Sequence, residues 1–462
     1  MKIRFVTALA ALSLAGSGLM TNPARAAAPG VSNEAEFLDA VDDANADSSI
    51  SEIVFAPNAV IELTDEVRYT GVQDLTLVGR GATISGATAT ADTDTWDSGL
   101  FVSESGGDLR VERLTFADSF NNGLAVFLPE GSGTVEIVVD QVTVTDAQFH
   151  GVLIDGQATT GYNTDDFIHP NCEDPYFVDS GTSVDITVDR SVITGAGRLD
   201  GYDTSQETGC PQDFDGLRVD QGGVGDLVAD LDRSTFDGNL ADGVELDEKG
   251  DGSVDAAVDR SSFNDNGDTV AILCTVEEFC GDDLDQEIED LDDGFDIDEE
   301  DAGDLTVIVS RSEVNDNRDE GMDMDEAGEG SIVGTVTKTE ASRNGDEGYK
   351  ASEADAGNNT ADISKSTFED AGNDQIEVES EDGDGSGTVT VNVAKTASTG
   401  ADGSGVKAVE DDGGVVLVTV DKSTLANNGE WGVEAAGGSG SVNVSKSDLS
   451  GNTDGEVELD TP

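Results

Sequence analysis

The chain has 462 residues, with 99 Asp and Glu against 23 Lys and Arg, so its formal net charge is −76. Such a negative field repels phosphates and argues against nucleic acid or anionic membranes as partners. Acidic chains with few aromatic residues can be disordered, but 36% of these residues are apolar and recur at regular intervals, which indicates a folded chain.

The first residues have the pattern of an export signal. Lys2 and Arg4 precede an apolar stretch at 5–14, and small residues continue to "ARAAAPG" at 24–30. We expect residues 1–26 to be a signal peptide and residues 27–462 to form a single domain. No other apolar run reaches the ~18 residues that span a bilayer, so we expect a secreted or periplasmic protein without membrane insertion.

The segment "SNEAEFLDAVDDA" at 32–44 predicts a short helix over 32–45. Asn33 has the pattern of an N-cap because Glu36 follows it by three residues, and Phe37, Leu38 and Val41 would form one apolar face.

A four-residue phrase then repeats along the rest of the chain. It reads "VDRS" at 188–191 and "VSKS" at 444–447, with seven occurrences between, and the commonest step is 27 residues. A fixed period in this range indicates a solenoid. Each unit contains three short apolar-alternating segments, such as "SVDITV" at 183–188, and no helical period, which predicts an all-β parallel β-helix whose strands pair with their counterparts in the next coil.

Two further columns support this stacking. One is a column of asparagines, which can bond their neighbours above and below: Asn239, Asn266, Asn317, Asn344, Asn428 and Asn452. The other places Phe236, Phe263 and Phe368 at one inward position. The chain resembles the right-handed parallel β-helix of the pectate-lyase-like superfamily, over about 30–462, with a capping helix and with "LTLVGRGATISG" at 75–86 as its first full strands. The resemblance implies a fold that carries lyases, hydrolases, epimerases and non-catalytic adhesins.

Alternation within "GVELD" places Val244 and Leu246 inside, so Glu245 and Asp247 point outward. The same register predicts two outward columns on successive coils: Leu153, Arg218, Glu245, Asp296, Asp323 and Lys350 in one, and Asp155, Asp220, Asp247, Asp298 and Asp325 in the other. Carboxylates ~4.8 Å apart repel one another by about 1 kcal/mol even in water.

Two interpretations of these acids are open. They could form a solvated acidic face, or a row of Ca²⁺ sites, since hard cations bind several carboxylate oxygens. The candidate ligands are Asp155, Asp220, Asp247, Asp296, Asp298, Asp323 and Asp325. No other cofactor is expected.

Nine bases recur at one position of the repeat: Arg190, Arg233, Arg260, Arg311, Lys338, Lys365, Lys395, Lys422 and Lys446. They could guide an anionic polymer, but the surrounding negative field favours neutralisation of adjacent acids such as Asp189 and Asp232.

Three insertions interrupt the coils, at about 156–182, 198–214 and 269–291, and long loops on rigid scaffolds often carry function. Tyr162, Tyr176 and Tyr202 in the first two could stack on sugars, or could pack the loops onto the coils. The four cysteines of an exported chain favour disulfides, and we expect Cys172–Cys210 and Cys274–Cys280, although three pairings are possible.

These features point to a monomer that binds or processes a polysaccharide or cell-surface glycan, either as a lyase or hydrolase or as a binder. The alternative is a structural or adhesive repeat protein without chemistry. Any working site should lie around Arg218, which is the only base in the first five coils of the outward columns. The candidate catalytic residues are Arg218, Asp220, Asp247 and His150, with Glu245, Asp296 and Asp298 as further acids, bases or metal ligands. Such a site could also hold a sugar acid.

Overall fold

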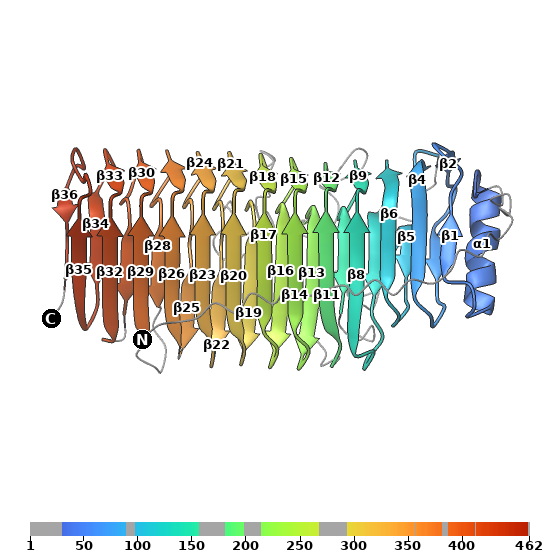
Figure 1. The fold of residues 1–462 in the computed structure, drawn as a ribbon, viewed down its shortest axis with the longest axis horizontal. Helices are drawn as coiled ribbons and strands as arrows, with labels where there is room; N and C mark the ends of the chain where they lie inside the picture. Colours follow the sequence, from blue (N-terminus) through green and yellow to red (C-terminus); the bar gives the residue numbers. More distant parts are fainter. Residues whose placement is uncertain are drawn as a thin grey trace, which may run out of the picture.

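The computed structural model of the protein describes residues 30–88, 98–156, 181–197, 214–267, 293–355, 357–380, 387–411 and 413–460. The described residues form one elongated stack of coils (Figure 1). Their strands belong to two sheets, of 23 and 13 strands, and every pairing between named strands is parallel and joins one coil to the next. The right-handed parallel β-helix predicted from the repeat is confirmed.

Each regular coil contains three strands, as the sequence predicts. The first and second strands lie in the 23-stranded sheet and the third lies in the 13-stranded sheet. The first strands are β1 (Glu52–Val54), β4 (Leu75–Ser85), β6 (Leu109–Ala117), β8 (Thr134–Asp140), β11 (Ser183–Asp189), β14 (Leu227–Asp232), β17 (Val254–Asp259), β20 (Asp304–Ser310), β23 (Ser331–Thr337), β26 (Asn358–Ser364), β29 (Thr388–Ala394), β32 (Val415–Asp421) and β35 (Ser439–Ser445). The longer β4 and β6 also occupy the position of a second strand.

The second strands are β2 (Val60–Glu62), β9 (Thr143–Thr145), β12 (Val192–Thr194), β15 (Thr235–Asp237), β18 (Ser262–Asn264), β21 (Glu313–Asn315), β24 (Glu340–Ser342), β27 (Thr367–Glu369), β30 (Ala397–Thr399) and β33 (Thr424–Ala426). The third strands are β3 (Val67–Tyr69), β5 (Gly99–Ser103), β7 (Asn122–Phe127), β10 (Val152–Asp155), β13 (Leu217–Gly223), β16 (Val244–Gly250), β19 (Asp296–Asp301), β22 (Asp325–Gly328), β25 (Ser352–Asp355), β28 (Glu377–Ser380), β31 (Lys407–Glu410), β34 (Trp431–Ala436) and β36 (Gly455–Val457).

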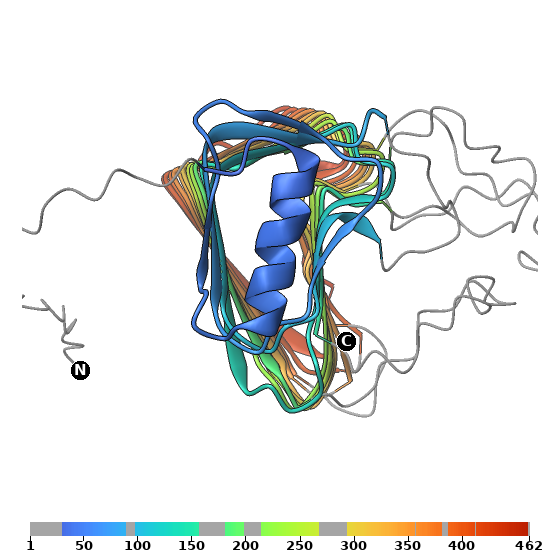
Figure 2. The same cartoon turned by 90° about the vertical axis from the view of Figure 1, so that its right-hand side faces the viewer.

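The helix α1 (Glu34–Ala46) covers the first coil (Figure 2). Asn33 caps it as predicted: its side chain accepts the Glu36 N–H at 3.1 Å, and Glu36 in turn accepts the Ser32 N–H at 2.9 Å. Phe37 and Val41 are buried, and Phe37 stacks on Phe101 of β5. Leu38, predicted to share this apolar face, is 39% exposed and lies outside it. The helix therefore shields the end of the apolar core from water.

Stacked columns of like residues fill the interior. Phe236 and Phe263 are fully buried, with ring centroids 5.3 Å apart. In the asparagine column each amide donates to the next coil: Asn239 to Asn266, Asn266 to Asn317, and Asn317 to Asn344, all at 3.1 Å. Both predicted columns are confirmed, and the amide chain satisfies polar groups that would otherwise be buried without partners.

The nine repeated bases stand at the bend between first and second strands, where all of them adopt positive φ between 51° and 59°. The arginines pair with acids of their own coil and of the preceding one: the Arg233 guanidinium lies 2.8 Å from Asp232 and 3.0 Å from Asp189. This geometry supports neutralisation of neighbouring acids as their role.

Several sequence predictions concern residues outside the described ones: the expected signal peptide, most of the three insertions, all four cysteines, and Tyr162, Tyr176 and Tyr202. Within the described part of the chain, no helix has the length and apolarity needed to cross a bilayer.

Candidate functional site

The third strands share one short pattern that positions three polar columns. In the coil of β16, Asp242 precedes Gly243, and then Val244 and Leu246 point into the core while Glu245 and Asp247 lie on the opposite face. Glycine is required after the acid because a Cβ at Gly243 would lie 2.5 Å from the carbonyl oxygen of Gly294 in the next coil. The coils therefore approach closely here, and side chains at equivalent positions stack.

We call the two predicted columns the first outward column, which contains Arg218 and Glu245, and the second outward column, which contains Asp220 and Asp247. Strand pairing confirms their register, because Arg218 faces Glu245 and Asp220 faces Asp247 across β13 and β16. The second column continues from Asp155 below to Asp298 and Asp325 above.

The interpretation of these columns as a solvated face is wrong for most of their acids. Asp155, Asp220, Asp247 and Asp323 are at most 2% exposed, and Asp296 is 5% exposed; only Asp298 and Asp325 are partly exposed. Because a buried charge without compensation is costly, these carboxylates need partners, protons or cations.

A third column, which we call the upstream column, was missed by the sequence analysis. It consists of one residue per coil, followed by glycine in six coils and by Gln375 in the last: His150, Asp215, Asp242, Asp293, Glu320, Glu347 and Asp374. All seven are buried. The signal in the sequence is an acid directly before glycine from Asp215 to Glu347, repeated at the same phase as the outward columns.

Arg218 joins the three columns. Its guanidinium lies 2.8 Å from Asp220, 2.9 Å from Asp247 and 3.5 Å from Asp215, and it also pairs with Glu245. The arginine is 9% exposed. The structure therefore brings together Arg218, Asp220 and Asp247, as the sequence analysis expected, and adds two acids to them.

His150 reaches this cluster through Asp215. Its Nδ1 lies 3.1 Å from the backbone nitrogen of Asp215 and 3.3 Å from the Asp215 Oδ2. A neutral Nδ1 would accept the N–H, whereas a protonated Nδ1 would donate to the carboxylate. Burial alone would raise the pKa of Asp215, but His150, Arg218 and a hydrogen bond from Glu245 outweigh it and lower that pKa to about 2.

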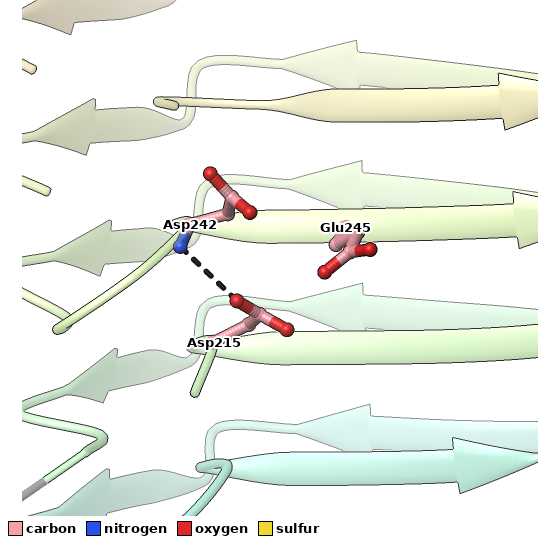
Figure 3. A group of neighbouring side chains, drawn as sticks. All are labelled: Asp215, Asp242 and Glu245. Atoms are coloured by element: carbon pink, nitrogen blue, oxygen red, sulfur yellow. Dashed lines mark hydrogen bonds between the residues drawn. The ribbon is translucent and has the colours of Figure 1, made fainter. Parts of the chain in front are cut away.

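Asp215, Asp242 and Glu245 form a compact group (Figure 3). They each offer a carboxylate oxygen, and these oxygens lie within 4.8 Å of one another. The Asp215 carboxylate accepts the backbone N–H of Asp242 at 3.1 Å, which ties the two coils together. Three comparable groups occur along the same sheet in the described residues: Asp293, Asp296 and Asp323; Asp319, Glu320 and Asp346; and Glu347, Asp374 and Glu377.

Two lysines of the first outward column repeat the role of Arg218. The Lys350 Nζ lies 3.0 Å from Glu320 and 2.8 Å from Asp323, both in the preceding coil. The Lys407 Nζ lies 3.5 Å from Asp374 and also pairs with Glu377. Even so, burial and the neighbouring Asp323 raise the pKa of Glu320 to about 8, and burial with Glu377 raises that of Asp374 to about 7. A single lysine therefore does not offset the whole cost of ionising the buried acids that it contacts.

A second ladder that the sequence analysis missed points into the coils. The set is Glu248, Glu299, Glu326 and Glu353, which are at most 1% exposed and stand in register on successive coils. The first three each follow an outward aspartate, and Glu353 follows Ser352. Each is tucked against the glycine four residues later; a Cβ at Gly303 would lie 2.4 Å from Glu299 Oε1. We call this set the glutamate ladder. Its signal in the sequence was glutamate four residues before a turn glycine.

Comparison with known proteins gives little beyond architecture. No protein-family model matches the chain, and no curated protein matches it. Among solved structures it is similar to the periplasmic alginate epimerase AlgG, at 10% identity and a TM-score of 0.41 over 92% of this chain and 82% of that one. It is also similar to the mannuronan C-5 epimerase AlgE4 A-module of Azotobacter vinelandii, at 12% identity and a TM-score of 0.36 over 94% and 96%. At these values the likenesses assign no activity or substrate to this chain.

Proposed function

We propose that this is an exported protein that binds and hydrolyses a neutral polysaccharide at the cluster around Arg218. The observation that carries the proposal is the group formed by Asp215 and Glu245. Their carboxylate oxygens lie within 4.8 Å of each other, and Asp215 is held ionised, with a pKa of about 2, while the neighbouring Glu245 is paired with Arg218.

Two neighbouring carboxyl groups in different protonation states are what glycoside hydrolysis uses. In this cluster the ionised Asp215 would serve as nucleophile or base, and Glu245, at 7% exposure, would donate a proton to the leaving oxygen. Arg218 and His150 would act as positioning residues, since both contact Asp215 and keep it charged. A short separation of the carboxyl groups favours retention of configuration, because little room is left between them for a water.

The charge of the cluster argues against the sugar acid considered from the sequence. Arg218 contacts four carboxylates, Asp215, Asp220, Glu245 and Asp247. With Glu245 protonated, as the proposal requires, the arginine and its three other acids would still carry a net −2, and a uronate would add a further negative charge. A neutral sugar hydroxyl, by contrast, can donate hydrogen bonds to these oxygens.

The test is release of reducing ends from a panel of neutral glycans and polyuronides. We expect cleavage of a neutral glycan, and a loss of at least ~100-fold in turnover for Glu245→Gln and Asp215→Asn. Asp325→Asn, in the partly exposed part of the second outward column, is the matched control and should retain activity. Melting temperatures check that each variant is folded. Turnover that survives both substitutions, or no action on any neutral glycan, would refute the proposal.

A structural or adhesive repeat protein is the second candidate, and one observation favours it. Lys350 and Lys407 hold acids of the upstream and first outward columns much as Arg218 does, so the Arg218 cluster could be one instance of a repeated structural ion pair. In that case Arg218→Met should lower the melting temperature without altering the binding of any glycan.

A further inference from the structure

We propose that Asp293, Asp296 and Asp323 bind a divalent cation, with Ca²⁺ as the best fit. The three carboxylates come from two successive coils, between the Arg218 and Lys350 coils, and their oxygens lie within 4.8 Å of one another. All three side chains are at most 5% exposed. This site lies one coil beyond the proposed hydrolytic cluster and touches it, because the Asp293 N–H donates to Asp242 and Asp296 faces Glu245, but its occupancy by a cation does not require the proposed hydrolysis.

Asp293 provides an independent indication that a ligand belongs here. It is 1% exposed and its Oδ1 has no hydrogen-bond partner. Among the described residues no basic group contacts it; instead its neighbours are the acids Glu320, Asp242, Asp323 and Asp319. An isolated buried carboxylate facing only acids needs a proton or a cation.

The protein itself shows where a cation sits in equivalent coils. The Lys350 Nζ approaches the upstream acid Glu320 and the outward acid Asp323 of the coil before it, and Lys407 does the same with Asp374 and Glu377. In the coil before Glu320 and Asp323, the residues at these two positions are Asp293 and Asp296. The residue in the position of the lysine is Asp323, which supplies a third carboxylate in place of an ammonium group.

The neighbouring sequence supplies no replacement for that lysine. Residues 268–292, which lead into Asp293, contain no Lys or Arg; of the other two insertions, 157–180 contains none and 198–213 contains Arg198. The Lys350 Nζ lies 2.8 Å from Asp323. Within the described part of the chain it forms no ion pair with Asp293. An external cation would therefore complete the pattern that lysines complete in the coils of Glu320 and Asp374.

Oxygen ligands alone select a hard cation, and Ca²⁺ accepts irregular sets of six to eight oxygens. Three carboxylates from a rigid sheet, completed by water or backbone oxygens, fit Ca²⁺ better than Mg²⁺, which requires near-octahedral geometry. The sequence analysis placed Ca²⁺ on the outward columns only; the structure adds the upstream Asp293 and restricts the proposed site to one place.

The experiment is calorimetric titration of CaCl₂ into full-length protein after dialysis against chelator, in 0.5 M NaCl to suppress diffuse binding by the acidic surface. Asp293→Asn removes a ligand. Asp323→Lys places an ammonium group where Lys350 and Lys407 have theirs, so it should replace the cation while preserving the fold. Asp374→Asn is the matched control, since it changes the equivalent upstream acid in a coil where Lys407 is present.

We expect one saturable binding event in the parent and in Asp374→Asn, and its loss in both other variants. The parent should also melt at higher temperature in CaCl₂ than in NaCl of equal ionic strength, and Asp323→Lys should show no such difference. If the parent shows no saturable event, or if the event persists in folded Asp293→Asn and Asp323→Lys, the assignment is wrong. Circular dichroism establishes that each variant is folded, and Asp323→Lys provides the decisive result if Asp293→Asn does not fold.

Discussion

The glutamate ladder should make the protein less stable as the pH rises, and Glu326→Gln should reduce that dependence. Burial, followed by the charges of Glu299 and Glu353, raises the pKa of Glu326 from its ordinary 4.5 to about 9. Both of its side-chain oxygens lack hydrogen-bond partners, and the side chain is 1% exposed. The same position one coil before Glu248 is occupied by Gln221, a neutral amide, so the core accommodates the proposed substitution.

The sign and size of the effect follow from linkage. An acid whose pKa is higher in the folded state holds its proton there while the unfolded chain releases it, so stability is complete below pH 4.5 and falls until the pH passes about 9. Each such group costs about 1.4 kcal/mol per pH unit. Between pH 4.5 and 7 this amounts to at most about 3 kcal/mol for Glu326, a cost that glutamine does not incur because it stays neutral.

The assay is urea unfolding at pH 5, 7 and 8.5, in 0.5 M NaCl with chelator present so that divalent cations do not stabilise the ladder. Glu326→Gln should match the parent near pH 5 and exceed it increasingly at pH 7 and above. Glu329→Gln, on the exposed turn that follows, is the control and should behave as the parent does. A parent that becomes more stable between pH 5 and 8.5, or an equal pH dependence in both variants, would refute a protonated ladder.

Three further outcomes are expected. Asn317→Ala should cost about 2–4 kcal/mol in unfolding free energy, because it removes the side-chain bonds to Asn344 and to the carbonyl of Phe263 and takes away the buried acceptor of Asn266. Urea unfolding measures this, and a loss below 1 kcal/mol would contradict it. Gly303→Ala should lower the melting temperature more than Gly131→Ala does, because the new Cβ at position 303 would lie 1.7 Å from the Gly252 carbonyl oxygen. Gly131 has open space around it, and only its positive φ disfavours alanine. Arg218→Ala should destabilise by about 3–5 kcal/mol at pH 7 and by less at pH 5, where its buried acids can take up protons; equal losses at both pH values would show that those acids need no compensation.

The stacked columns of the interior could be predicted from the sequence because equivalent residues recur once in every coil. The repeated coil places the same position of every coil directly above the last, so Asn239 and Asn266, 27 residues apart, and Asn266 and Asn317, 51 residues apart because of an insertion, had to meet once the strands were parallel. The outward register of Asp220 and Asp247 followed from alternation alone. The cap at Asn33 was predictable for the same reason, since its partner Glu36 is three residues away.

The sequence by itself therefore determined the coil, its register and the meeting of Arg218 with Asp220 and Asp247. Only the tertiary structure decided that these acids are buried rather than solvated and that Asp215 and His150 complete the cluster. It alone also showed that, among the described residues, Asp293 faces acids and contacts no base. Alternation states which face of a strand a side chain occupies, but burial depends on what lies over that face. Ion pairing depends on which long side chain reaches across from the next coil, as Lys350 does to Glu320. Burial and ion pairing both depend on distances between coils, and the residue pattern within one coil does not specify those distances.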